Sequence, residues 1–250
     1  MIPLSDDNPV LRTPIVTYAI LIAIAAAWVV LQGVGLDPYK LAASVCNLGL
    51  VAGEITQQAP RGTTVPIGHG LACVVDRESI NYLTPLTSMF LHGGWMHLLG
   101  NALFLWVFGN NVEDSMGRGR FLVFYLVCGL VAAAAQIAID PASPIPMVGA
   151  SGAISGVMGA YLRLYPRVRV NMLFIIVIFI RVIPLPAWLV LLYWIGLQVL
   201  MAFGDTAGGV AVMAHIGGFV AGAVLVTVFA NDRRVAIRTY ERHRRHPDHP

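Results

Sequence analysis

A few polar side chains interrupt long apolar stretches of the sequence, and their types are those of hydrolytic catalysis. Ser151 lies in "GASG" and His215 in "AHIGG". A serine attacks a carbonyl only when a neighbouring base takes its proton, and histidine can be that base. The two residues therefore predict acyl-transfer chemistry with Ser151 as the nucleophile and His215 as the general base.

The negative oxygen formed in such a reaction needs hydrogen-bond donors held in place beforehand. His97 and Asn101 are four residues apart, so they share one face of a helix and can donate toward one point. The backbone N–H of Ser151, at a helix N-terminus, is a third candidate donor. No carboxylate lies within an apolar segment to orient His215, which predicts a dyad rather than a triad.

A metal site is the alternative use of these histidines. His92 and His97 are five residues apart, which is not the spacing of the HExxH zinc motif, and the glutamate of that motif is missing. We therefore expect no metal and no other cofactor.

The elements that must position these residues are transmembrane helices. Hydrophobic residues make up 57% of the chain, charged residues only 12%, and the mean hydropathy is +0.74, which indicates an all-α polytopic membrane protein. Six segments are long and apolar enough to be spanning helices. They run over Pro14–Val34, Trp95–Phe108, Phe121–Ile139, Ala150–Tyr165, Ala187–Phe203 and Gly209–Ala230.

Small residues recur at helical spacing in the fourth and sixth segments. These stripes consist of Gly152, Gly156 and Gly159 in one and Ala211, His215, Gly218 and Gly222 in the other. Small residues let two backbones approach closely, so the stripes can bring Ser151 within hydrogen-bond reach of His215.

Two further apolar stretches are not simple spanning helices by pattern alone. The first apolar segment is too long for a signal peptide and follows Asp6 and Asp7 rather than positive charge, so we interpret it as a retained helix. The apolar run Val170–Ile183 contains Arg181 and is followed by prolines, which favours a strand-like or re-entrant connection at the cytosolic face.

The distribution of lysine and arginine predicts six spans with both termini in the cytosol. The arginines on the inner side are Arg12, Arg118, Arg120, Arg163, Arg167, Arg169, Arg233, Arg234, Arg238, Arg242, Arg244 and Arg245. The expected organisation is a cytosolic segment (1–13), a membrane domain (14–230) with a long external loop (35–94), and a basic cytosolic tail (231–250). We expect the tail to contact lipid headgroups rather than nucleic acid.

Cys46 and Cys73 share the external loop, and whether they form a disulfide stays open.

Three motifs together resemble the rhomboid intramembrane serine proteases: "HGGWMHLLGN" from His92 to Asn101, "GASG" from Gly149 to Gly152, and "AHIGG" from Ala214 to Gly218. The resemblance implies a six-helix bundle whose fourth helix starts at mid-depth below a water-filled cavity open to the outside. It also implies transmembrane substrates and a multi-pass protein of the bacterial inner or plasma membrane. The residues to which it assigns roles are Ser151 (nucleophile), His215 (base), His97 and Asn101 (oxyanion), Gly149, Gly152 and His92 (support), and Glu113 (packing of the cytosolic end).

Two departures accompany this resemblance. Members of the family often carry Trp-Arg in the first loop, where this chain has "YLTPLTS", and many carry an aromatic residue at the position of Ser155, stacked under the histidine. The glycine-rich stretch "AFGDTAGGV" is expected to be a movable cap over the cavity. The rival interpretation is a catalytically silent relative that binds transmembrane helices without cutting them.

Overall fold

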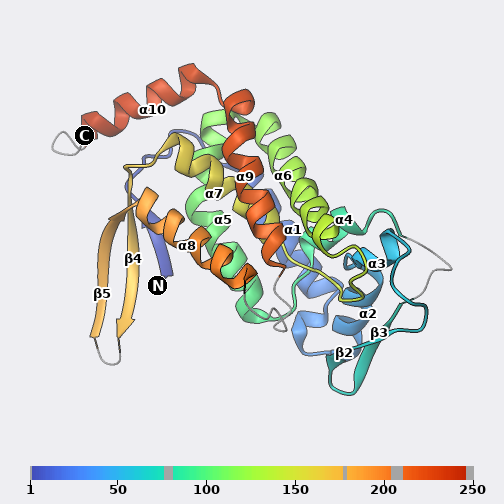
Figure 1. Cartoon of the computed structure of the whole chain (residues 1–250). Coiled ribbons are helices and arrows are strands. Elements are labelled where there is room, and N and C mark those ends of the chain that lie inside the picture. The colour runs from blue at the N-terminus through green and yellow to red at the C-terminus, as the bar shows by residue number, and fades with distance from the viewer. Residues whose placement is uncertain (1, 76–80, 177–178, 204–210, 246–250) are drawn as a thin grey trace.

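The computed structural model describes residues 2–75, 81–176, 179–203 and 211–245, and the chain is mostly helical (Figure 1). Each of the six expected segments contains a helix. These helices are α1 (Ile15–Val30), α5 (Trp95–Met116), α6 (Arg118–Ile139), α7 (Ser151–Leu164), α8 (Ala187–Ala202) and α9 (Val212–Phe229). Among the described residues, α6 and α9 are long and apolar enough to cross a membrane alone, while α1 and α8 are apolar but have 16 residues each.

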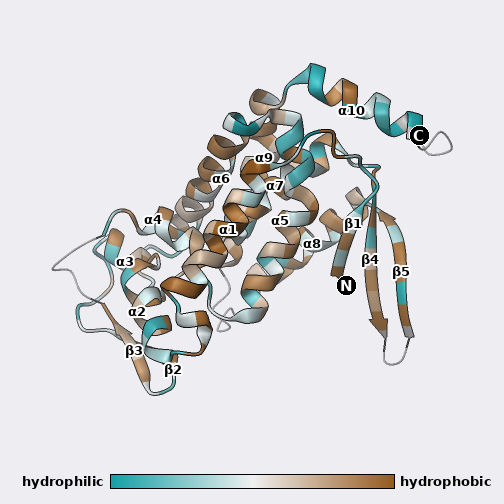
Figure 2. Cartoon of the chain, turned by 180° about the vertical axis from the view of Figure 1, so that it is seen from behind, coloured by the Kyte–Doolittle hydropathy of each residue, from teal (hydrophilic) through white to brown (hydrophobic). Residues whose placement is uncertain are grey.

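The helix α7 lies at the centre of the bundle, where α5, α6 and α9 pack around it. All its residues from Gly152 to Tyr161 are buried. By contrast, the outer helices expose large apolar side chains, such as Ile22 on α1 and Val228 on α9. Figure 2 shows that hydrophobic residues predominate along the bundle helices, while hydrophilic residues are frequent on α10 (Asp232–Arg245) and on the connecting loops. Such a surface suits contact with lipid.

The prediction of an all-α fold is wrong for part of the chain. An antiparallel sheet in the order β1-β4-β5 is formed by β1 (Ile2–Asp6), β4 (Arg169–Ile176) and β5 (Phe179–Pro186), and stands out from the bundle (Figure 1). The run 170–183 is thus a β-hairpin, as its strand-like interpretation predicted. It is rich in β-branched residues and pairs with itself, and the N-terminal residues, expected as a separate segment, add a third strand.

The long loop between α1 and α5 folds into small elements at one end of the bundle (Figure 1). They are η1 (Gly33–Gly35), α2 (Pro38–Leu48), α3 (Ala52–Ile55), β2 (Thr64–Gly68), β3 (Leu71–Val74), α4 (Thr84–Thr87) and η2 (Ser88–Phe90). A disulfide between Cys46 and Cys73 joins α2 to β3, which answers the question left open by the sequence. The Thr87 hydroxyl donates to the carbonyl of Leu48 at 2.7 Å, so "YLTPLTS" braces this loop without an arginine.

A polar cluster ties the opposite end of the bundle together. The guanidinium of Arg238 on α10 is only 1% exposed and pairs with Asp114 and Asn111 of α5. The carboxylate of Asp6 on β1 accepts hydrogen bonds from Asn111 and from Tyr161 of α7. Part of the basic tail is therefore buried in the fold, which local sequence alone did not indicate.

Glu113 caps the start of the first helix from this same end. Its two carboxylate oxygens accept hydrogen bonds from the backbone N–H groups of Val16 and Thr17, at 3.0 and 2.7 Å, and one also accepts from the Thr17 hydroxyl. These N–H groups have no partner within their own helix because they lie in its first turn. Glu113 thus packs the end of the bundle, as the family resemblance implied.

Asp6 gives the fold a testable pH dependence. Burial raises the pKa of Asp6 from 3.8 to about 6, against the opposing effects of the bonds from Tyr161 and Asn111 and of the Arg238 charge. Between these two values the folded state binds more protons than the unfolded chain, so the contribution of Asp6 to stability falls as pH rises through this window.

The Asp6→Asn variant should lose this contribution. When the pH is lowered from 7 to 5, the unfolding temperature of the wild type, measured in detergent, should rise relative to that of Asp6→Asn at the same pH. Asp140→Asn, at an exposed position, is the matched control and should follow the wild type. An unchanged pH dependence in Asp6→Asn would contradict the assignment.

Candidate active site

Ser151 and His215 lie together, as the sequence predicted. Ser151 is the first residue of α7, His215 lies in the first turns of α9, and the Oγ of Ser151 is 2.8 Å from Nε2 of His215. This distance allows the serine hydroxyl to donate to the imidazole, which is the geometry that a general base needs.

The two glycine stripes explain why these helices approach so closely. A Cβ on Gly218 would overlap the carbonyl oxygen of Gly152, and a Cβ on Gly222 would overlap that of Gly156. The backbones are therefore in direct contact at both levels, as the spacing of small residues indicated. Gly152, predicted as a supporting residue, lies at the level next to Ser151.

The other ring nitrogen of His215 has a partner that the sequence interpretation missed. Nδ1 of His215 is 2.8 Å from Oε1 of Gln198, which is on α8 and only 9% exposed. The ring of Trp194, one turn earlier on α8, lies 5.7 Å from the imidazole, centroid to centroid. The sequence does mark Gln198, because it is the one amide or charged residue in the fifth apolar segment.

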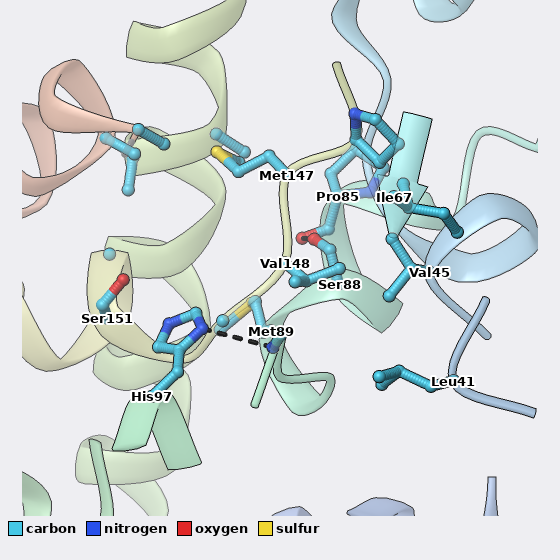
Figure 3. A pocket seen from close by; sticks show the side chains of 18 of the residues that line it. Leu41, Val45, Ile67, Pro85, Ser88, Met89, His97, Met147, Val148 and Ser151 are labelled. Atoms are coloured by element: carbon cyan, nitrogen blue, oxygen red, sulfur yellow. Dashed lines mark hydrogen bonds between the residues drawn. The ribbon is translucent and has the colours of Figure 1, made fainter. Parts of the chain in front are cut away.

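A cavity of about 730 Å³ opens beside this pair. Ser151, His215 and His97 line it together with residues of the loop between α1 and α5. Figure 3 shows Ser151 and His97 close together on one side of the cavity, with the apolar side chains of Leu41 and Val45 on the opposite side. The mostly apolar lining suits a hydrophobic polypeptide segment.

His97 and Gly149 lie next to Ser151. Nδ1 of His97 accepts a hydrogen bond from the backbone N–H of Gly93 at 3.3 Å, which leaves the proton on Nε2. A Cβ on Gly149 would lie 2.6 Å from that Nε2 and 3.6 Å from the Ser151 Oγ, so His97, Gly149 and Ser151 converge on one point. Gly149 also has φ +129°, a conformation that other residues rarely adopt.

Asn101 is placed differently from His97. Its side chain is buried, but it is not among the described residues that line the cavity. Its Nδ2 has no hydrogen-bond partner among the described residues. A role for Asn101 in binding the oxyanion therefore stays a prediction.

His92 and Ser155 are buried next to the residues of the candidate site. Both backbone polar groups of His92 bond to the side-chain amide of Gln32, at 2.7 and 2.9 Å, and its ring packs edge-on against that of His97 at 5.1 Å. The buried Ser155 donates to the carbonyl of Ser151 at 2.6 Å, and so serves its own helix.

The sequence also led us to expect no metal site and a movable cap over the cavity. Within the part of the chain that the structure describes, no three His, Cys, Asp or Glu side chains gather in a way that could hold a metal ion. The cap expected in "AFGDTAGGV" lies largely at 204–210, outside the described residues.

Comparison with known proteins gives a consistent family. A family model described as "Rhomboid domain" matches residues 81–232. The "Rhomboid protease GluP" of Bacillus subtilis is 36% identical over 137 residues, which are 55% of this chain and 24% of that protein. The "Putative rhomboid protease YdcA" of the same organism is 36% identical over 77 residues, 31% of this chain and 38% of that protein. The "Rhomboid-like protease 5" of Toxoplasma gondii is 35% identical over 154 residues, 59% of this chain and 16% of that protein. The chain thus spans well under half the length of each.

Proposed function

Because the chain belongs to the rhomboid family of multi-pass membrane proteins, we propose that it is an intramembrane serine endopeptidase that cleaves transmembrane helices. The observation that carries this proposal is the 2.8 Å contact between the Ser151 Oγ and His215 Nε2 at the wall of a large cavity. The names of the relatives, which include rhomboid proteases, support the same reaction class.

In the proposed mechanism His215 takes the Ser151 proton as Oγ attacks the carbonyl carbon of the scissile peptide bond. The resulting oxyanion accepts hydrogen bonds from the Nε2–H of His97 and the N–H of Ser151, with Asn101 as a further predicted donor. His215 then gives its proton to the leaving amine, and an acyl-enzyme remains on Oγ. Water, deprotonated by His215, releases the second product and restores the serine.

The substrate class follows from the physics of lipid. A helix in the bilayer satisfies its backbone groups internally, so its peptide bonds are hidden until a segment unwinds. We propose that substrates carry small or helix-breaking residues near the outer face of the membrane. The unwound segment then enters the cavity between Ser151 on one side and Leu41 and Val45 on the other. Partners are thus transmembrane proteins and lipids, without nucleic acid or metal.

The proposed topology has six spans with both termini in the cytosol, which puts the cavity on the external side. The membrane domain covers 14–230, with its external loop at 35–94 and the basic tail at 231–250. We propose the bacterial inner or plasma membrane as its location, since relatives such as the Bacillus subtilis GluP are bacterial.

Covalent labelling tests this function. A fluorophosphonate added to folded protein in detergent reacts only with an activated serine, which displaces fluoride and forms an Oγ–P bond. Digestion and mass spectrometry should locate the label on Ser151, and heat-unfolded protein should not react. Absence of label in folded protein, while the Bacillus subtilis GluP reacts in parallel, would overturn the proposal and favour a relative that binds helices without cutting them.

A further inference from the structure

The dyad mechanism does not use the contacts that α8 makes with the ring of His215 on the side away from Ser151. Trp194 and Gln198 are four residues apart, so they project from one face of α8. That face is turned to α9, since both side chains contact His215. Neighbouring residues such as Leu200, 69% exposed, lie on the outer surface of the same helix.

An amide side chain in an apolar helix is costly unless it is hydrogen-bonded. Gln198 is 9% exposed, and its Oε1 lies 2.8 Å from Nδ1 of His215. An amide oxygen can only accept, so this arrangement places the imidazole proton on Nδ1. The lone pair of Nε2 then faces the Ser151 hydroxyl, which is the tautomer that a general base requires.

An aromatic ring contacts the imidazole of His215 from α8. Ser155 stands where many family members have an aromatic residue under the histidine, and its hydroxyl is engaged with the carbonyl of Ser151. In this chain an aromatic ring reaches His215 from α8: Trp194 lies 5.7 Å away at an interplanar angle of 43°. Trp194 is itself stacked on Phe219 of α9, with centroids 6.3 Å apart.

We propose that α8 positions the general base in this protein: Gln198 fixes the tautomer and orientation of His215, and Trp194 supports its ring in place of an aromatic residue on α7. Both are positioning residues, because they act through His215 and do not touch the reacting atoms. The inference deepens the proposed function and rests on it for its kinetic consequence, whereas the tautomer of His215 can be tested without any activity.

Two variants of Gln198 separate hydrogen bonding from packing. Gln198→Met keeps the length of the side chain but removes the acceptor, whereas Gln198→Glu keeps an acceptor oxygen. Val199→Met, at an exposed position next along α8, is the matched control for a methionine in this helix. Unfolding temperatures of all three, measured in detergent, establish that they are folded.

The first readout is the rate of fluorophosphonate labelling. Gln198→Met should label on the order of 10- to 100-fold more slowly, the range known for metal-ligating histidines that lose the hydrogen-bond partner that orients them. Gln198→Glu should recover most of the rate, and Val199→Met should equal the wild type. Trp194→Leu should lower the rate, and Trp194→Phe, which keeps a ring, should recover it.

The second readout is the nitrogen-15 NMR spectrum of the His215 ring. The wild type should show a neutral imidazole protonated at Nδ1, and Gln198→Met a mixture of both tautomers. Equal labelling rates and an unchanged tautomer in folded Gln198→Met would overturn the inference while the proposed function stands. If the wild type does not label at all, the proposed function fails, and the tautomer of His215 in wild type and Gln198→Met alone decides the inference.

Discussion

Replacement of Ser151 or His215 by alanine is expected to slow the cleavage of a transmembrane substrate by about a thousandfold or more. Ser151→Ala removes the attacking oxygen. His215→Ala leaves a hydroxyl with no base within hydrogen-bond reach among the residues that the structure describes, because Nε2 of His215 is the group 2.8 Å from Oγ. Since the two residues act as one unit, the double variant should be no slower than either single variant.

The measurement is single-turnover cleavage in proteoliposomes, followed by separation of the two products. Ser155→Ala is the matched control, because it removes from the same helix a serine hydroxyl that donates to the carbonyl of Ser151. This control should cleave at nearly the wild-type rate. Substantial cleavage by folded Ser151→Ala would show that another nucleophile is at work and would exclude the dyad.

Replacement of Gly222 by alanine is the substitution expected to damage the fold most. The added methyl group would overlap the carbonyl oxygen of Gly156, and the atoms in conflict belong to two backbones rather than to movable side chains. Relief requires α9 to move away from α7. We expect a loss of about 3 kcal/mol or more in the free energy of unfolding.

Activity should fall with stability in Gly222→Ala, because α9 also carries His215. Thermal unfolding in detergent and the rate of fluorophosphonate labelling measure the two effects on the same sample. Gly196→Ala on α8 is the matched control: a Cβ there meets no atom within 4 Å, and alanine favours the helix, so stability should be kept or slightly raised. A Gly222→Ala protein as stable as this control would contradict the close helix crossing.

Several features could be predicted from the sequence because their causes are local. Apolar runs of the right length form helices wherever they lie, so the six helical segments were recognisable. Glycines four residues apart mark a helix face that can approach another backbone, and the stripes of α7 and α9 indeed meet. The pairing of Ser151 with His215 followed from those stripes and from the chemistry of the two side chains.

Other features depended on which faces meet in three dimensions. The sequence marked Gln198 only as an amide in an apolar run, and the rotation of α8 placed it against Nδ1 of His215. The strand β1 pairs with β4, for example Ile2 with Leu173, and no local pattern encodes a contact so distant along the chain. Asn101 shares a helix face with His97 by spacing, yet among the described residues it is His97, and not Asn101, that lines the cavity. Local chemistry thus determined what the residues are able to do, and tertiary packing decided which of them meet.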